Sequence, residues 1–223
     1  MKIFLKILKY TLYGIPALMI LTLIVRVATS GDPPEARHML NTGAIESAYR
    51  NLGGEFALYS IRVRNPFTHG DTFRVVDVMY FESARDLQIT LRSKKNRFEN
   101  LWNSAGAPAQ VEDFHSLLKL YMRVTTNIYE ETDGVQQRRT EREVFEVSAS
   151  YMFENARYEY MRVNFSDVYI DYRRSRVDLF IFHDFREIDS DDLNNADYLG
   201  RVTIFDANMP RQATQIDSVE RLN

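Results

Sequence analysis

The stretch DLQITLR (residues 86–92) alternates between apolar and polar side chains. Leu, Ile and Leu occupy positions 87, 89 and 91, and the positions between them hold Gln and Thr. A repeat of two residues is the repeat of a β-strand that buries one face and leaves the other polar. This stretch therefore predicts a strand that lies on a hydrophobic core.

The same repeat recurs on both sides of this stretch, in short segments separated by turn residues. The predicted strands are 56–64, 73–81, 86–92, 117–131, 142–150, 157–165, 167–171, 176–184 and 200–206. Parallel strands need long crossovers that are usually helical, and hardly any helical pattern lies between these segments, so we expect antiparallel pairing. The sequence predicts a mainly β protein: an antiparallel β-sandwich, immunoglobulin-like or similar, of eight to nine strands. A closed barrel is the alternative.

The pair Asp133-Gly134 lies between two of these segments. Both residue types tolerate a positive φ, which the tightest hairpin turns require. We therefore expect the segment 117–131 to turn back directly at this point, with the returning strand at 142–150.

The first 30 residues differ from the rest in charge and hydropathy. Their charged residues are all basic, and the run 10–25 carries no charge. Such a run can cross a bilayer when its flanking Lys and Arg side chains extend their charged ends to the headgroups. The alternative is a cleaved signal peptide, with small residues at positions 28 and 30. Lysines before the run predict a cytoplasmic N-terminus.

These patterns divide the chain into five parts. Residues 1–9 are expected to form a cytoplasmic basic start, and residues 10–30 a transmembrane anchor or signal peptide. Residues 31–54 are expected to form a linker and a short helix, residues 55–206 the extracytoplasmic β-sandwich, and residues 207–223 a polar tail. We expect a single-pass protein of the cell membrane, or a secreted protein if the leader is cleaved.

Charge and cysteine content exclude several classes of function. The whole chain carries −3, and the first 30 residues carry four positive charges, so the remainder carries −7. A nucleic-acid-binding protein needs a basic surface to displace counterions from phosphate, so no nucleic-acid partner is expected. The chain has no cysteine, which excludes disulfides, thiolate metal sites and cysteine nucleophiles. A cysteine-free exported domain favours a bacterial envelope.

The segment HDFREIDSDDLNNADYLG (183–200) is the densest run of metal-ligand side chains. Calcium takes six to eight oxygen ligands, commonly carboxylates that one loop wraps around the ion. The candidate ligands are Asp184, Asp189, Asp191, Asp192 and Asp197. The other interpretation is a solvated loop whose charges protect a sheet edge from pairing. Calcium is the one cofactor that the sequence suggests.

Residues 177–206 resemble one strand–loop–strand unit of the calcium-dependent phospholipid-binding sandwiches typified by the second conserved domain of protein kinase C. The matching positions are Asp184 at the strand end, Asp191 or Asp192 in the loop, and Leu199-Gly200 before the next strand. Arg186 stands where the family has a second aspartate. The resemblance implies a sandwich, and a calcium-dependent contact with lipid.

Three basic segments lie at or beside predicted strand ends: RSKKNR (92–97), RRTER (138–142) and YRRSR (172–176). If the fold brings them together, they form a patch for a phosphate-rich wall polymer or lipid headgroups. The alternative is that they are charged turn residues that keep the protein soluble.

No catalytic motif is recognisable in the chain. The four histidines form no HExxH, no glycine-rich loop precedes a helix, and no GxSxG is present. We therefore expect non-enzymatic binding or scaffolding at the bacterial cell envelope, with an envelope protein or polymer as partner. The alternatives are a calcium-dependent membrane contact through residues 184–197 and an extracytoplasmic hydrolase that uses carboxylates.

Overall fold

The chain divides into two compact units, Met1–Pro34 and Glu35–Asn223. The computed structural model describes residues 13–22, 25, 32–33, 36, 58–67, 73–94, 118–132, 135–155, 157–183, 193 and 199–215. In the first unit, residues 13–22 are helical and exposed. Within the described ranges, no helix has both the length and the apolar character needed to span a membrane. Much of the predicted anchor lies outside these ranges.

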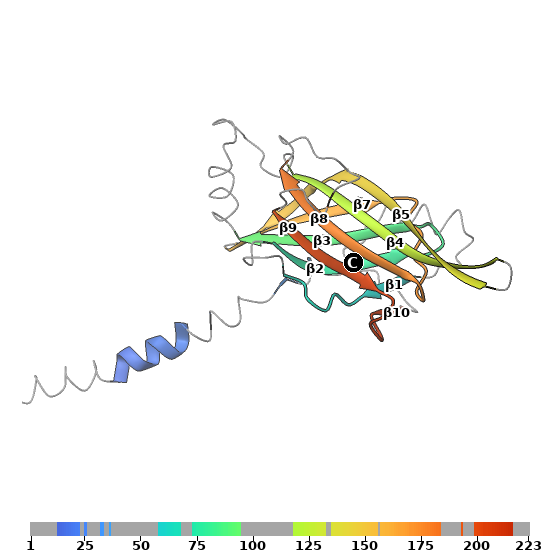
Figure 1. Cartoon of the computed structure of the whole chain (residues 1–223). Coiled ribbons are helices and arrows are strands. Elements are labelled where there is room, and N and C mark those ends of the chain that lie inside the picture. Colours follow the sequence, from blue (N-terminus) through green and yellow to red (C-terminus); the bar gives the residue numbers. More distant parts are fainter. Residues whose placement is uncertain are drawn as a thin grey trace, which may run out of the picture. The chain divides into compact units, whose positions relative to one another are not determined.

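The described part of the second unit contains ten strands (Figure 1). They are β1 (Leu58–Ile61), β2 (Phe73–Phe81), β3 (Asp86–Lys94), β4 (Leu118–Thr132), β5 (Val135–Ser148), β6 (Ser150–Glu154), β7 (Tyr158–Phe165), β8 (Ser175–His183), β9 (Gly200–Asp206) and β10 (Ala213–Gln215). All strand pairs are antiparallel, as predicted.

The strands form two sheets. One sheet has six strands in the order β10-β1-β2-β3-β7-β6, and the other has four in the order β5-β4-β8-β9. The immunoglobulin fold places its first, second, fifth and fourth strands in one sheet and the third in the other. Here β1, β2 and β3 are consecutive neighbours in one sheet, so the strand order is not that of an immunoglobulin domain.

One hydrophobic core joins the two sheets. Its residues come from alternate positions of both, such as Ile89 and Leu91 on β3 and Leu120 and Met122 on β4, all four fully buried. Strands such as β4 and β8 thus turn one set of alternate side chains into this core, as the repeat of two residues predicts. The mainly β, antiparallel architecture is confirmed.

Several strand boundaries agree with the sequence and others differ. Strands β2 and β9 span the predicted 73–81 and 200–206. Strand β5 begins at Val135, seven residues before the predicted start, while β10 and all of β6 except Ser150 lie in segments for which no strand was predicted. Residues 167–171 form no strand, although Val168 and Ile170 are buried.

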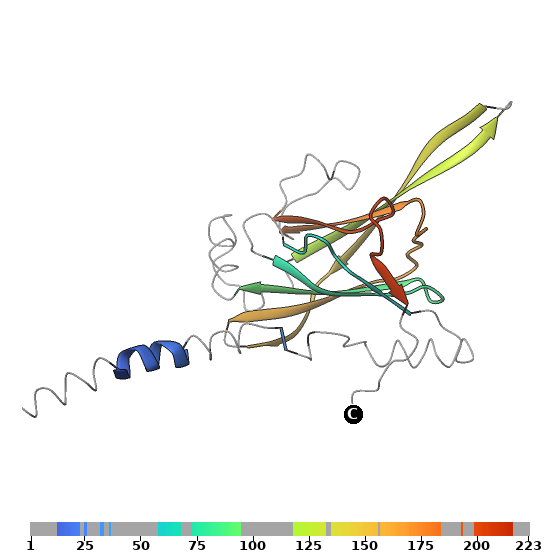
Figure 2. The ribbon, with the colours of Figure 1, turned by 90° about the horizontal axis from the view of Figure 1, so that it is seen from below.

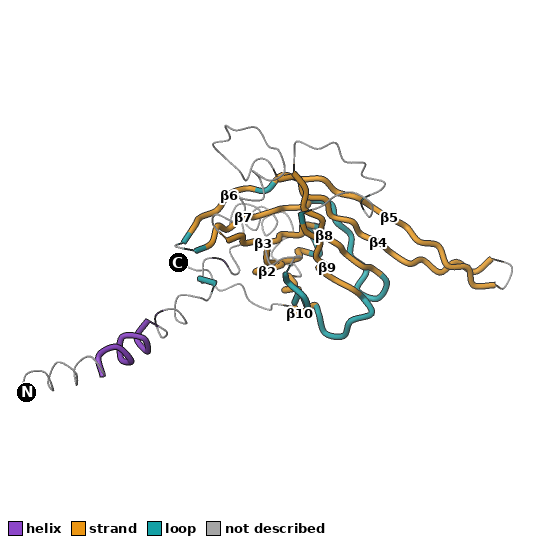
Figure 3. The backbone as a smooth tube through the Cα atoms, turned by 60° about the vertical axis from the view of Figure 1, so that its left-hand side comes forward, coloured by secondary structure: helices purple, strands orange, loops and turns teal. Residues whose placement is uncertain are grey.

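The hairpin of β4 and β5 is the longest element of this unit. Pairing continues to Thr132 and Val135, so the predicted direct return of the chain is confirmed, while Asp133 and Gly134 themselves lie outside the described residues. Pairing of β4 with β8 ends at Thr126, which leaves residues 127–132 paired with β5 alone. This two-stranded arm extends beyond the other strands, as Figures 2 and 3 show.

Candidate functional site: an arginine-rich sheet face

The two faces of the four-stranded sheet carry different side chains. On β4, Leu118, Leu120, Met122 and Val124 point into the core. The residues between them therefore point to the other side, because successive side chains alternate across a strand. We call this second side the outer face.

Strand pairing brings arginines from all four strands onto the outer face. Thr125 of β4 lies between Arg142 of β5 and Arg176 of β8. In the next row, Arg123 of β4 lies beside Asp178 of β8. In the row beyond that, Arg201 of β9 lies beside Phe180 of β8. With Arg138, which pairs with Tyr129 on the arm, these arginines define the arginine face: Arg123, Arg138, Arg142, Arg176 and Arg201. Arg123, Arg176 and Arg201 contact Asp178.

Asp178 is the buried centre of this face, and its side chain is only 2% exposed. Arg176 donates to it from Nε at 3.1 Å and from Nη2 at 3.2 Å, and Arg201 donates from Nη2 at 3.3 Å. The Thr203 hydroxyl donates to Oδ1 at 2.7 Å. The Arg123 Nη2 lies 3.7 Å from Oδ2. A buried charge needs partners of this kind, and here it has four.

These contacts fix the charge state of Asp178. Burial alone raises the pKa of this carboxyl, but hydrogen bonds from Thr203 and Arg176 and the charges of Arg176 and Arg201 outweigh it. The net result is a pKa below the ordinary value. Asp178 is therefore an anion at neutral pH, and it accepts hydrogen bonds rather than donating them.

The surroundings of Arg123 lower the pKa of its guanidinium. Burial lowers its pKa, the charge of Asp178 opposes that effect, and the positive charges of Arg201 and Arg142 add to it. A guanidinium remains protonated throughout the physiological range. The lowered pKa of Arg123 is therefore mainly an effect of burial, to which the charges of Arg201 and Arg142 add less.

An aromatic layer lies beneath the guanidinium groups. The Cζ atoms of Arg123 and Arg201 each lie 5.0 Å from the centre of the Phe180 ring, which is fully buried. Two planar cations on one ring are held by attraction to its π face. Phe180 also packs with Tyr121, Phe182 and Leu193, which form a second buried cluster on this face.

Polar contacts continue along the base of the arm. The Asn127 amide oxygen accepts hydrogen bonds from Arg138 at 3.0 Å and 2.8 Å and from the Thr140 hydroxyl at 3.3 Å. The backbone N–H of Asn127 donates to the Arg174 carbonyl at 3.2 Å. Arg174 also lies over the Tyr129 ring at 6.0 Å. The arm is thus tied to the turn before β8.

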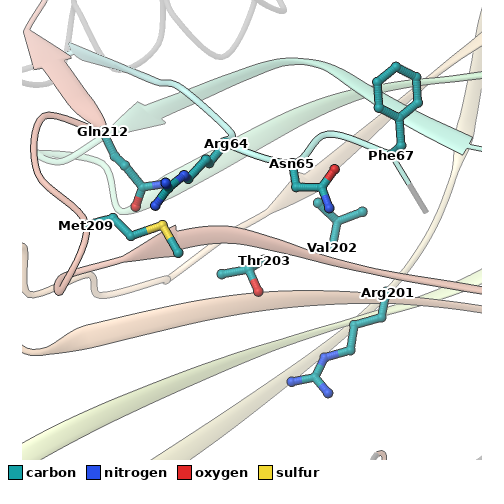
Figure 4. A pocket seen from close by; sticks show the side chains of 8 residues that line it. All are labelled: Arg64, Asn65, Phe67, Arg201, Val202, Thr203, Met209 and Gln212. Carbon is teal, nitrogen blue, oxygen red and sulfur yellow. The ribbon is translucent and has the colours of Figure 1, made fainter. Parts of the chain in front are cut away.

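A groove of about 430 Å³ lies beside β9, the edge strand of this sheet (Figure 4). Its lining residues are Arg64, Asn65, Phe67, Arg201, Val202, Thr203, Met209 and Gln212. None of these eight side chains is a carboxylate. Figure 4 shows the Arg201 guanidinium turned away from the other labelled side chains, in agreement with its hydrogen bond to Asp178.

The fold brings together two of the three predicted basic segments. Segments 138–142 and 172–176 both contribute arginines to the arginine face. Arg92 of the third segment lies on the six-stranded sheet, with its Cζ 4.1 Å from the centre of the Tyr158 ring. The remainder of that segment, residues 95–97, lies outside the described residues.

The predicted calcium ligands Asp184, Asp189, Asp191, Asp192 and Asp197 all lie outside the described residues. Within the described ranges, no group of three or more metal-ligating side chains is close enough to hold an ion. Leu193, which lies between these aspartates in sequence, is buried against Tyr121, Phe180 and Phe182. Calcium binding by this loop stays a prediction, and a rise in melting temperature with millimolar calcium is the measurement that tests it.

Sequence reasoning missed three residues of the arginine face: Arg123, Asp178 and Arg201. Arg123 and Asp178 each lie between two apolar residues of their strand, and Arg201 precedes the apolar Val202. Such a residue is a usable signal, because an isolated charge in a strand that is buried on both faces requires a partner of opposite charge.

No protein-family model, curated protein sequence or solved structure matched this chain in the comparisons with known proteins.

Proposed function

We propose that this chain is a non-enzymatic binding module of the bacterial cell envelope. Residues 10–30 anchor it in the membrane, and its extracytoplasmic β-sandwich holds an anionic partner on the arginine face. One observation carries the proposal. Five arginines lie on one sheet face, and three of them, Arg123, Arg176 and Arg201, converge on the buried carboxylate of Asp178, in a chain whose net charge is −3.

The chemistry of arginine favours anion binding over simple solubility. A guanidinium presents five N–H donors in a planar fork that matches phosphate and carboxylate oxygens. On this face Asp178 and the Phe180 ring hold Arg123 and Arg201 in place. A cation that is already ordered loses less conformational entropy when a ligand binds.

Two features support binding over hydrolysis. A carboxylate-based hydrolase needs two acids in a shared pocket, and the groove beside β9 is lined by no acid. The lowered pKa of Asp178 keeps it ionised, whereas a general acid at neutral pH needs a raised pKa.

Sequence pattern alone supports the anchor. The charge-free run 10–25 follows three lysines, which is the arrangement that leaves an N-terminus in the cytoplasm. The test is fractionation of bacterial cells that produce the full chain, followed by protease treatment of spheroplasts. We expect the chain in the membrane fraction and cleavage by added protease. Recovery in the soluble cytoplasmic fraction contradicts the anchor.

The binding proposal is tested with the full chain in detergent micelles. We expect a chromatography matrix that bears phosphate groups to retain the protein at low salt. The same matrix without phosphate groups should not retain it. The variant R138Q/R142Q/R176Q should elute at markedly lower salt. The matched control is R85Q/R157Q/R211Q, which removes the same charge from exposed positions outside the arginine face. Equal elution of the two variants contradicts the proposed site.

A further inference from the structure

Resting on the proposed function, we propose that the anionic partner is a linear phosphodiester polymer that lies across the arginine face from β5 to β9. The spacing of the arginines, the position of Asp178 and the burial of the nearby aromatic side chains support this partner.

The arginines follow a diagonal line across the sheet. Arg138 and Arg142 both lie on β5. Arg123 lies on the neighbouring strand β4, two residues along the strand direction from the position that pairs with Arg142. Arg201 lies on β9, two strands from β4, and a further two residues along. Strands are about 4.8 Å apart, and alternate residues on one face are about 6.8 Å apart, so the line is roughly 30 Å long. A track of this length fits a chain of charges rather than one ion.

Asp178 excludes the simplest alternative, a single phosphate at the centre of the cluster. The Asp178 carboxylate already occupies the point on which the guanidiniums of Arg123, Arg176 and Arg201 converge. Its contacts engage Nε and Nη2 of Arg176 and Nη2 of Arg201, so Nη1 of each lies outside this network. A ligand therefore meets the arginines one after another along the track.

Burial of the aromatic rings favours a polymer without bases. Proteins that bind single-stranded nucleic acid stack successive bases on exposed aromatic rings. Phe180, which lies under Arg123 and Arg201 near the β9 end of the track, is fully buried, and Tyr129, which is 51% exposed, lies at the arm end beside Arg138. One exposed ring supports no series of stacked bases, so we expect the backbone charges alone to be recognised.

The same burial disfavours a bilayer as the partner. Membrane-surface binding needs apolar side chains that enter the acyl boundary. Beneath and beside the arginines, Tyr121, Phe180 and Phe182 are at most 4% exposed and pack against Leu193. The aromatic side chains at the centre of the face therefore offer no exposed apolar surface, and Val144, which is 37% exposed beside Arg123, is too small an apolar area to enter an acyl boundary alone.

The test measures binding of glycerol phosphate oligomers of increasing length to the full chain in detergent micelles. We expect affinity to rise with each added repeat until the oligomer spans about 30 Å, and then to level off, because successive contacts share one chain. Monomeric glycerol phosphate should bind at least about a hundredfold more weakly than the longest oligomer. Equal affinity for monomer and oligomer overturns the inference.

Two further ligands separate the alternatives. Oligodeoxythymidylate with the same number of phosphates should bind within about tenfold of the glycerol phosphate oligomer if only the backbone is recognised. Much tighter binding of the oligonucleotide contradicts recognition of the backbone alone. Binding to anionic lipid vesicles with no binding to any oligomer assigns the face to a membrane and overturns the inference.

Arginine variants locate the track. For a single-stranded polyanion, the logarithm of the binding constant falls linearly with the logarithm of the salt concentration, and the magnitude of the slope is about 0.7 for each phosphate that the protein neutralises. The variant R138Q/R142Q should therefore lower the magnitude of the slope by about 1.4. The control R85Q/R157Q should leave the slope unchanged. If R138Q/R142Q weakens binding but affinity is independent of oligomer length, the proposed function stands and the linear track fails. If no polyanion binds, both fail.

Discussion

The two faces of the four-stranded sheet are built from the same strands but are stabilised by different interactions. The inner face of β8 carries Val177, Leu179 and Ile181, all fully buried in the shared core. Its outer face carries Arg176, which is exposed, and Asp178, which is buried under arginines from three strands. The inner face depends on shape and apolar area, and the outer face on matched charge.

The two faces also differ in how far their residues can be recognised from the local sequence. An inner-face residue is recognised from its own strand, because the repeat of two residues is local. The outer-face cluster exists only once Arg123 and Arg201, 78 positions apart in the sequence, are paired with the same strand. The core should therefore dominate stability, and the outer face should dominate binding.

The largest effect is expected on the inner face. Leu179→Ala removes a fully buried side chain and should lower the free energy of unfolding by about 2–5 kcal/mol. Chemical denaturation of the full chain in detergent measures this loss. Polyanion binding per folded molecule should be unchanged. A loss below about 0.5 kcal/mol contradicts the assignment of Leu179 to a tightly packed core.

Asp178→Asn should have the next largest effect. The substitution removes the anion that neutralises three arginines, and we expect a loss of about 1–3 kcal/mol in the free energy of unfolding. The pKa of Asp178 is lower in the folded chain, so its stabilising effect is complete above about pH 4 and is lost as pH falls through the folded value. The difference in stability between wild type and variant should therefore be constant near neutral pH and shrink below about pH 4.

Denaturation at several pH values checks this dependence. If the wild type and Asp178→Asn keep the same difference down to the lowest pH, Asp178 is not the paired anion that the geometry indicates.

A smaller effect is expected at the base of the arm. Asn127→Ala removes the oxygen that accepts hydrogen bonds from Arg138 and Thr140, both at exposed positions. We expect a loss of about 0.5–1.5 kcal/mol and faster amide hydrogen exchange in residues 135–140. Unchanged exchange in those residues indicates that strand pairing alone orders the arm.

The smallest effect on stability is expected at Arg142. Its side chain is exposed, so Arg142→Gln should change the free energy of unfolding by no more than about 0.5 kcal/mol. The same substitution should weaken polyanion binding measurably, because it removes one cation of the track. Arg157→Gln is the matched control. Loss of stability without loss of binding reverses the roles assigned to the two faces.

The strands that line the hydrophobic core were predicted well from the sequence. Segments such as 73–81 and 200–206 were placed correctly because their buried side chains alternate or run continuously between clear turn residues. The start of β5 was missed because residues 135–141 are exposed on both faces, so no apolar alternation marks them. Strand β10 was missed because it has only three residues, none strongly apolar.

The arginine face was predicted only in part. Arg138, Arg142 and Arg176 were found as members of basic segments, and their gathering at strand ends was anticipated as one of two alternatives. Arg123 and Arg201 were not found, because nothing local to either strand indicates that both contact Asp178. The acidic segment 183–200 is conspicuous in the sequence because its charges are adjacent there, whereas those of the arginine face are adjacent only through strand pairing.

The most direct test of the central claim is to observe the arginine side chains during binding. Nε–Hε resonances of the full chain in micelles can be followed while a glycerol phosphate oligomer is added, with resonances assigned through Arg→Gln variants. The account predicts shifts at Arg138, Arg142 and Arg176 and none at Arg85 or Arg157. Shifts confined to arginines of the six-stranded sheet, or no shifts at saturating oligomer, would contradict it.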